Sequence, residues 1–262
     1  MCVLAFAWKT DPEYPLIFVS NRDEYHSRPS KRLERWPNTS VYAPRDLKGG
    51  GTWLGFTADG RWAAITNFRD GIKQIEKPIS RGILVKDFLL SSASPKQYAE
   101  EISHKVQTFN GFNLLVGDIE SIEYIGNRRK SDNVFTETLT EPGIYTLSNH
   151  LLNAPWPKTV SLREKFTKTL IQNEIVNLRD YIELLQSTET YDQERLPNTG
   201  IPSELEQKLS SIFIVGNEYG TRSSTAMKFN RREHSIQILE VQYDSDGAAN
   251  QKMRFNFAVN HH

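Results

Sequence analysis

The chain begins with two apolar segments, MCVLAFAW at residues 1–8 and LIFV at residues 16–19. Residues with a high strand preference dominate both segments, and Asp11, Pro12 and Pro15 between them are typical of a turn. The two segments therefore predict a β-hairpin of buried strands. In a hairpin of this length, the end of the second strand lies beside the start of the first, where Cys2 stands.

The composition of the 262-residue chain is that of an ordinary globular protein, with 38% hydrophobic and 24% charged residues. Its 32 basic and 32 acidic side chains balance, so there is no general attraction to phosphate backbones or anionic lipids. We therefore expect neither nucleic acid nor a membrane surface as the main partner. The single cysteine excludes an internal disulfide and a zinc site built from two or more thiolates.

The pattern of apolar residues divides the rest of the chain into blocks of strands and pairs of helices. Asp59-Gly60 between two apolar runs predicts a second hairpin, and the polar stretch over residues 22–51 predicts a long loop region. Helical periodicity covers residues 83–89, about 95–109, about 157–172 and 178–186. Strand-like runs cover residues 53–57, 61–66, 112–116, 121–125, 144–147, 212–215, 224–229, 236–241 and 253–259. This order favours an α+β fold of antiparallel sheets with helical layers, in a single domain over residues 1–262.

Several kinds of site have no support in the sequence. There is no phosphate-binding glycine loop, and the histidines show no close metal-ligand spacing, so we expect neither a metal nor a tightly held cofactor. The first apolar run lacks a basic segment before it and is soon interrupted by charges, so it does not resemble a signal peptide. No run approaches the roughly 18–20 apolar residues of a membrane-spanning helix. We therefore expect a cytoplasmic protein with no integral membrane segment, of undefined oligomeric state.

The position of Cys2 suggests a nucleophile. Removal of Met1 would leave Cys2 with a thiol and a free α-amine, and the amine can accept the thiol proton as it does in N-terminal threonine catalysis. An ordinary thiol is only a few per cent thiolate at neutral pH, so a neighbouring base or cation matters. The alternative is that Cys2 is simply a small apolar residue at the start of a buried strand.

A charged motif, Ser20-Asn21-Arg22-Asp23-Glu24, follows the second predicted strand directly. The hairpin places Arg22 and Asp23 next to Cys2, where a guanidinium would lower the pKa of the thiol and a carboxylate would hold the α-amine. Successive strand residues alternate between faces, so whether Asp23 or Glu24 meets Cys2 stays open. The alternative is a surface turn with its own ion pairs.

These residues and four later segments resemble the NRDE family, whose members are similar to transport and Golgi organization protein 2. The resemblance extends over nearly the whole chain and is sharpest in about the first eighty residues. The segments that carry it are Met1-Cys2, Asn21-Arg22-Asp23-Glu24, Gly50-Gly51-Thr52-Trp53-Leu54-Gly55, Thr66-Asn67 and Tyr219-Gly220-Thr221-Arg222-Ser223-Ser224.

The resemblance implies a fold of the N-terminal-nucleophile (Ntn) hydrolase type, a four-layer αββα sandwich of two stacked antiparallel sheets. By similarity to Ntn amidases of the choloylglycine hydrolase type, Cys2 would be the nucleophile, with Arg22 and Asp23 as its partners. In that group the Arg and Asp are three residues apart, whereas Arg22 and Asp23 are adjacent.

Three further site residues follow from the same similarity. Asn67 and Asn149 would be oxyanion donors, and Arg222 would be a late cation of the site. From the residues alone, each Asn is equally an amide that caps a strand end or turn, and Arg222 is equally a turn charge.

Two functions of different classes follow. The first is an N-terminal-cysteine hydrolase or acyltransferase that acts on an amide or thioester bond of a small molecule. The second is a non-catalytic carrier or chaperone of a hydrophobic small molecule, since proteins resembling this family are connected with haem trafficking, with acyl-CoA or lipid metabolism and with Golgi organisation. The sequence contains no haem-attachment motif, so only transient haem binding agrees with it.

Overall fold

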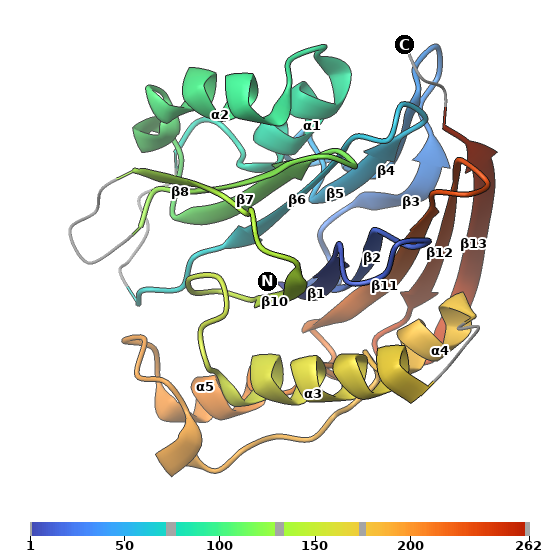
Figure 1. Ribbon diagram of the computed structural model, residues 1–262. Coiled ribbons are helices and arrows are strands. Elements are labelled where there is room, and N and C mark those ends of the chain that lie inside the picture. The colour runs from blue at the N-terminus through green and yellow to red at the C-terminus, as the bar shows by residue number, and fades with distance from the viewer. Residues whose placement is uncertain (1, 72–76, 129–133, 173–176, 260–262) are drawn as a thin grey trace. The chain divides into compact units, whose positions relative to one another are not determined.

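The computed structural model describes residues 2–71, 77–128, 134–172 and 177–259 (Figure 1). Its contacts divide the chain into two compact units. Unit 1 consists of residues 1–27, 69–72 and 142–256, and unit 2 of residues 28–68, 73–141 and 257–262. Both units are built from interleaved segments of the chain, and a single domain over residues 1–262 stays a prediction.

Unit 1 is built on one antiparallel sheet, here called sheet A. Its strand order is β10-β1-β2-β11-β12-β13, which brings the first two strands of the chain between two later ones. The strands are β1 (Cys2–Trp8), β2 (Leu16–Tyr25), β10 (Gly143–Leu147), β11 (Tyr219–Asn230), β12 (Ser235–Tyr243) and β13 (Ala249–Ala258). The predicted N-terminal hairpin is confirmed, with Cys2 paired to Arg22 and Trp8 to Leu16.

One face of sheet A is covered by helices. Figure 1 shows α3 (Pro157–Gln172) and α4 (Leu178–Glu183) along this face, and α3 packs on β1 and β10. One buried cluster joins this helix to the sheet. It contains Leu162 and Phe166 of α3 and three alternate residues of β1, namely Val3, Ala5 and Ala7. Side chains of the opposite parity, Cys2 among them, therefore point to the other face of the sheet. Unit 1 also contains the short helices η2 (Gln193–Arg195) and α5 (Ser203–Lys208).

Unit 2 is built on a second antiparallel sheet, sheet B, with strands in chain order. They are β3 (Ser30–Arg35), β4 (Val41–Asp46), β5 (Leu54–Thr57), β6 (Trp62–Asn67), β7 (Phe112–Gly117), β8 (Ile122–Gly126) and β9 (Phe135–Thr138). Two helices, α1 (Gly82–Leu90) and α2 (Pro95–Ser103), pack on this sheet, and η1 (Val106–Thr108) follows them. Gly60, with φ of +83°, forms the predicted turn between β5 and β6.

The structure corrects several predicted elements. Residues 22–51 are not one long loop, because β2 extends to Tyr25 and β3 and β4 follow. In β3 only Leu33 is buried, and β4 ends in the charged residues Arg45 and Asp46, so both strands lie in a polar stretch of the sequence. Residues 212–215 are not a strand, since Phe213 N donates to Ser187 O and Ile214 N to Thr221 Oγ1 in place of a ladder. The predicted helix over residues 95–109 ends at Ser103 and continues only as η1.

The predicted α+β class, with antiparallel sheets and helices in pairs, is confirmed. Strand β9 and helix α5 were not predicted, because each is short and mostly exposed. Among the described residues, no helix combines the length and apolar character needed to cross a membrane.

Candidate functional site

Cys2 opens β1 and lies between two neighbouring strands of sheet A. Its side chain is 8% exposed. It faces Arg22 across the β1–β2 ladder, as the hairpin predicts. Burial raises the pKa of the Cys2 thiol; the positive amino terminus and Arg22 act to lower it, and Asp23 and Glu24 to raise it further. The thiol is therefore the resting form, and a proton acceptor is needed to activate it.

Arg22 and Glu24 share the face of β2 opposite Asp23. Arg22 is buried, and its Nη2 lies 3.9 Å from Glu24 Oε2. Glu24 is the more exposed partner, so the pair retains contact with solvent. Because Cys2 is directly opposite Arg22 and therefore on the same face, the guanidinium is the nearest cation along the ladder.

Asp23 lies on the helix-covered face of sheet A and is 1% exposed. Thr221 Oγ1 of β11 donates a hydrogen bond of 2.7 Å to Asp23 Oδ1, and the Tyr219 hydroxyl donates one of 3.1 Å to the Asp23 carbonyl. Burial raises the pKa of the Asp23 carboxyl; the amino terminus, Lys158, the Thr221 hydroxyl and Arg22 counteract this rise, in that order. Asp23 is thus a buried carboxyl group that accepts a hydrogen bond from the Thr221 hydroxyl and is influenced by nearby cations.

The segment after β10 approaches Cys2 from the other side. Leu147, the last residue of β10, pairs with Leu4 of β1, and the chain bends over the three residues that follow. Ser148 Oγ donates to the Cys2 carbonyl at 2.9 Å and also lies 3.3 Å from Asn149 Oδ1. Asn149 is fully buried, and its carbonyl accepts a hydrogen bond from the Arg69 backbone at 2.7 Å. The structure therefore brings Asn149 to the same end of sheet A as Cys2 and Arg22.

Arg222 occupies a β-bulge in β11, where the register shifts between Thr221 and Ser223. Its Nη1 donates to the Tyr25 carbonyl at 2.9 Å and to the His26 carbonyl at 3.2 Å. Burial lowers the pKa of the Arg222 guanidinium, against the charge of Glu24. These contacts secure the end of β2, so Arg222 has a structural task beside any chemical one.

Asn67 is the last residue of β6 in unit 2, where it pairs with Phe112. It ends the sixth strand rather than the third or fourth, because β3 and β4 precede the second hairpin. Asn67 belongs to unit 2, whereas Cys2 belongs to unit 1.

Sequence reasoning missed a group of buried charges in unit 1. Lys158 lies in the first turn of α3, is 1% exposed and donates from Nζ to the Leu209 carbonyl at 2.9 Å. Arg69 Nη2 lies 3.0 Å from Glu206 Oε2, both side chains being buried, and the Arg69 guanidinium also stacks over the Trp156 ring at 4.6 Å. The spacing of Lys158, Leu162 and Phe166 at i, i+4 and i+8 was the available signal, since it puts a lysine in the apolar stripe of a helix.

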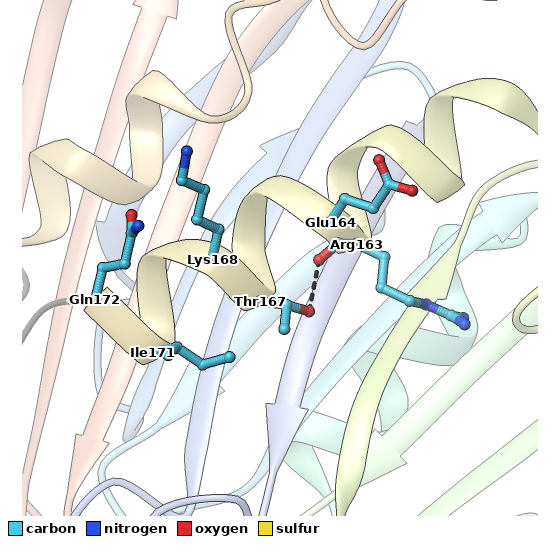
Figure 2. Close-up of a pocket in the computed structure, with 6 residues that line it drawn as sticks. All are labelled: Arg163, Glu164, Thr167, Lys168, Ile171 and Gln172. Carbon is cyan, nitrogen blue, oxygen red and sulfur yellow. Dashed lines mark hydrogen bonds between the residues drawn. The ribbon is translucent and has the colours of Figure 1, made fainter.

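A surface pocket on α3 is a separate feature. It has a volume of about 470 Å³ and is lined by Arg163, Glu164, Thr167, Lys168, Ile171 and Gln172 (Figure 2). All of these residues come from one helix, and the dashed bond in Figure 2 joins the Thr167 hydroxyl to the Arg163 carbonyl at 2.7 Å. None of them is a predicted site residue, so this pocket does not include the candidate site.

A solved structure shares the fold. The chain is similar to a Caenorhabditis elegans N-acylethanolamine-hydrolyzing acid amidase ortholog, with a TM-score of 0.52 and 11% identity over 86% of this chain and 92% of that one. At this identity the likeness concerns the fold alone, and it confirms the predicted fold class of the Ntn-hydrolase type.

Curated relatives match over most of their length. A mouse Transport and Golgi organization 2 homolog is 28% identical over 279 residues, covering 99% of each chain. A bovine Transport and Golgi organization protein 2 homolog is 30% identical over 254 residues, covering 89% of this chain and 90% of the relative. Residues 1–245 match the family described as "Transport and Golgi organisation 2". With its Cys2 hairpin, its late Tyr219–Ser224 segment and this match over most of its length, the chain belongs to the Transport and Golgi organisation 2 family.

Proposed function

We propose that the protein is an N-terminal-cysteine hydrolase or acyltransferase that acts on an amide or thioester bond of a small molecule. The observation that supports this most directly is the pairing of Cys2 with Arg22, with the buried carboxyl of Asp23 at the next position of β2. A thiol at the start of β1, with a cation and a carboxyl group near the paired end of β2, are the groups that this chemistry needs.

In the proposed reaction, removal of Met1 first leaves the α-amine on Cys2. The amine accepts the thiol proton, and Sγ attacks the carbonyl carbon of the substrate. The C–N or C–S bond then breaks, and the leaving group takes the proton back from the ammonium. Water releases the acyl group as a carboxylic acid from its thioester with Cys2, or a second nucleophile accepts it.

The remaining site residues have distinct tasks in this proposal. The Arg22 guanidinium stabilises the thiolate, and Asp23 orients the protonated α-amine. The amide group of Asn149 donates a hydrogen bond to the oxyanion that forms during attack. Arg222 is the late cation, which holds the end of β2 through the Tyr25 and His26 carbonyls.

Intact-mass spectrometry tests the proposal directly. The mass of the purified protein shows whether Met1 is removed, and incubation with panels of acyl thioesters and amides then shows whether an acyl adduct forms. We expect an adduct on the wild type and on Lys168→Met, an exposed-residue control, but not on Cys2→Ala. Because the chain has one cysteine, an adduct that is absent from Cys2→Ala depends on that thiol.

Retention of Met1 together with the absence of an adduct would contradict the hydrolase proposal. Saturable binding of haem or of an acyl-CoA that is the same in wild type and Cys2→Ala, again without an adduct, would favour the carrier of a hydrophobic small molecule. The two outcomes are distinguished by whether the ligand becomes covalently attached.

A further inference from the structure

Lys158 is a buried lysine on the face of α3 that otherwise carries apolar side chains into the core. It lies on the stripe of α3 that continues through Leu162 and Phe166, both of which are in the core beneath sheet A. Among the described lysines, Lys158 alone is buried. Burying an ammonium costs several kcal/mol unless opposite charges compensate it. The first turn of a helix adds a further cost, because its dipole is positive there.

Asp23 lies on the sheet face that this stripe covers. Strand alternation puts Asp23 on the same side of β2 as Ile17 and Val19, and these two residues belong to the same cluster as Leu162 and Phe166. The ammonium and the carboxylate therefore face the same core from opposite layers, one from the helix and one from the sheet.

The other buried cations of the region, Arg69 and Arg22, are paired or directed elsewhere. Arg69 is paired with Glu206 at 3.0 Å, and Arg22 points to the opposite face of β2. The Leu209 carbonyl satisfies one of the three N–H groups of Lys158.

The electrostatics agree with this geometry. Burial lowers the pKa of Lys158 to about 8, and Asp23 is the strongest influence in the other direction. Arg69 adds to the lowering, whereas Cys2 and Glu206 counteract it. In return, Lys158 acts against the burial that raises the pKa of the Asp23 carboxyl, together with the amino terminus, the Thr221 hydroxyl and Arg22.

We propose that Lys158 is a positioning residue, which keeps the Asp23 carboxylate ionised beside Cys2 from the helix-covered face of sheet A. The inference rests on the proposed function, because it is there that Asp23 must be ionised to hold the α-amine of the nucleophile. Lys158 itself contacts neither the substrate nor the reacting sulfur in this arrangement. Its charge acts through Asp23.

The first test measures the titration of Asp23 by NMR with ¹³C-carboxyl-labelled aspartate, assigned with Asp23→Asn. We expect Lys158→Met to raise the midpoint of Asp23 by at least about one pH unit, a tenfold change in its acid dissociation constant. Lys158→Arg keeps the charge and is expected to stay near the wild type, as is the exposed Lys168→Met, whose side chain lies in the α3 surface pocket (Figure 2). Superimposable Asp23 titrations in wild type and Lys158→Met would overturn the inference.

A second measurement does not depend on the folding of any Lys158 variant. Coupling between two sites is reciprocal, so Asp23→Asn must shift the titration of Lys158, followed by NMR with ¹³C-labelled lysine. We expect a lower midpoint for Lys158 in Asp23→Asn than in the wild type, and an unchanged midpoint would count against the inference. Both titrations use protein of one N-terminal state, checked by intact mass.

A measurement of acyl transfer as a function of pH distinguishes failure of this inference from failure of the proposed function. If acyl transfer occurs, the acidic limb of its pH profile is expected to move to higher pH in Lys158→Met by the same amount as the Asp23 titration. An acidic limb that stays in place would overturn the positioning role. If no acyl transfer occurs with any donor, the proposed function fails, while the two NMR titrations still decide whether Lys158 controls the charge of Asp23.

Discussion

The four residues of the Asn21-Arg22-Asp23-Glu24 motif have different roles, although they are adjacent in the sequence. Arg22 faces Cys2 across the ladder, Asp23 points to the helix-covered face, and Glu24 is partly exposed. Asn21 is fully buried and makes no contribution to the charge of the site. A motif that resembles a catalytic signature is therefore in part a structural one.

Asn21 joins β2 to two distant segments. Its Nδ2 donates to the Leu185 carbonyl at 2.8 Å and to the Ile212 carbonyl at 2.9 Å, and the Ser224 hydroxyl donates to its Oδ1 at 2.5 Å. Truncation would leave these buried groups unsatisfied, so we expect Asn21→Ala to lower the free energy of unfolding by about 2–3 kcal/mol, measured by urea denaturation. The exposed Asn256→Ala should change it by less than about 0.5 kcal/mol. Equal effects of the two substitutions would show that these bonds add nothing to stability.

At the scale of elements, local patterns predicted the strands that are apolar on both faces and missed those that are polar on one. β1 and β2 are buried almost throughout, so composition alone indicates them. In β3 only Leu33 is buried, and its neighbours look like a charged loop. The segment 212–215 shows the opposite error, since its apolar residues are buried without forming a ladder.

The same division applies to the candidate site. A hairpin is a local structure, so its length was enough to pair Arg22 with Cys2. Asn149 reaches Cys2 only through the long-range pairing of β10 with β1, which nothing local in the sequence specifies. The burial of Lys158 was not predicted, because a lysine in a helix is ordinarily assigned to the solvated face.

The β5–β6 hairpin depends on the backbone conformation of Gly60. Its φ of +83° lies in a region that residues with a Cβ atom rarely adopt, while an added Cβ would meet its nearest atom at an ordinary 3.4 Å. We therefore expect Gly60→Ala to cost about 1–2 kcal/mol, through conformational strain alone. The matched control is Gly143→Ala in β10, where no positive φ occurs and the nearest atom is at 3.5 Å. Thermal unfolding of both variants tests this, and equal melting temperatures would contradict it.

At the scale of the whole molecule, buried charges give the folded chain a dependence on pH that composition does not show. The formal net charge is zero, yet unit 1 buries Arg22, Asp23, Arg69, Lys158 and Glu206. Natural proteins retain such groups at a cost in stability where a function requires them. We therefore expect the contribution of Lys158 to stability to change with pH as its ammonium group loses its proton.

Lys158→Met tests that expectation through the sign of its pH dependence. Burial lowers the pKa of Lys158 from 10.5 in the unfolded chain to about 8 in the folded one. Between these values the unfolded chain binds more protons, so the contribution of Lys158 to stability is unfavourable below about pH 8 and improves as the pH rises to 10.5. We expect the stability of Lys158→Met relative to the wild type to fall by about 1–3 kcal/mol between pH 7 and pH 9.5, because the wild type gains stability as Lys158 loses its proton and the variant does not. Urea denaturation at both values measures it, with Lys168→Met as the control that should follow the wild type. A difference in stability between Lys158→Met and the wild type that stays constant with pH would mean that packing, and not the buried charge of Lys158, determines it.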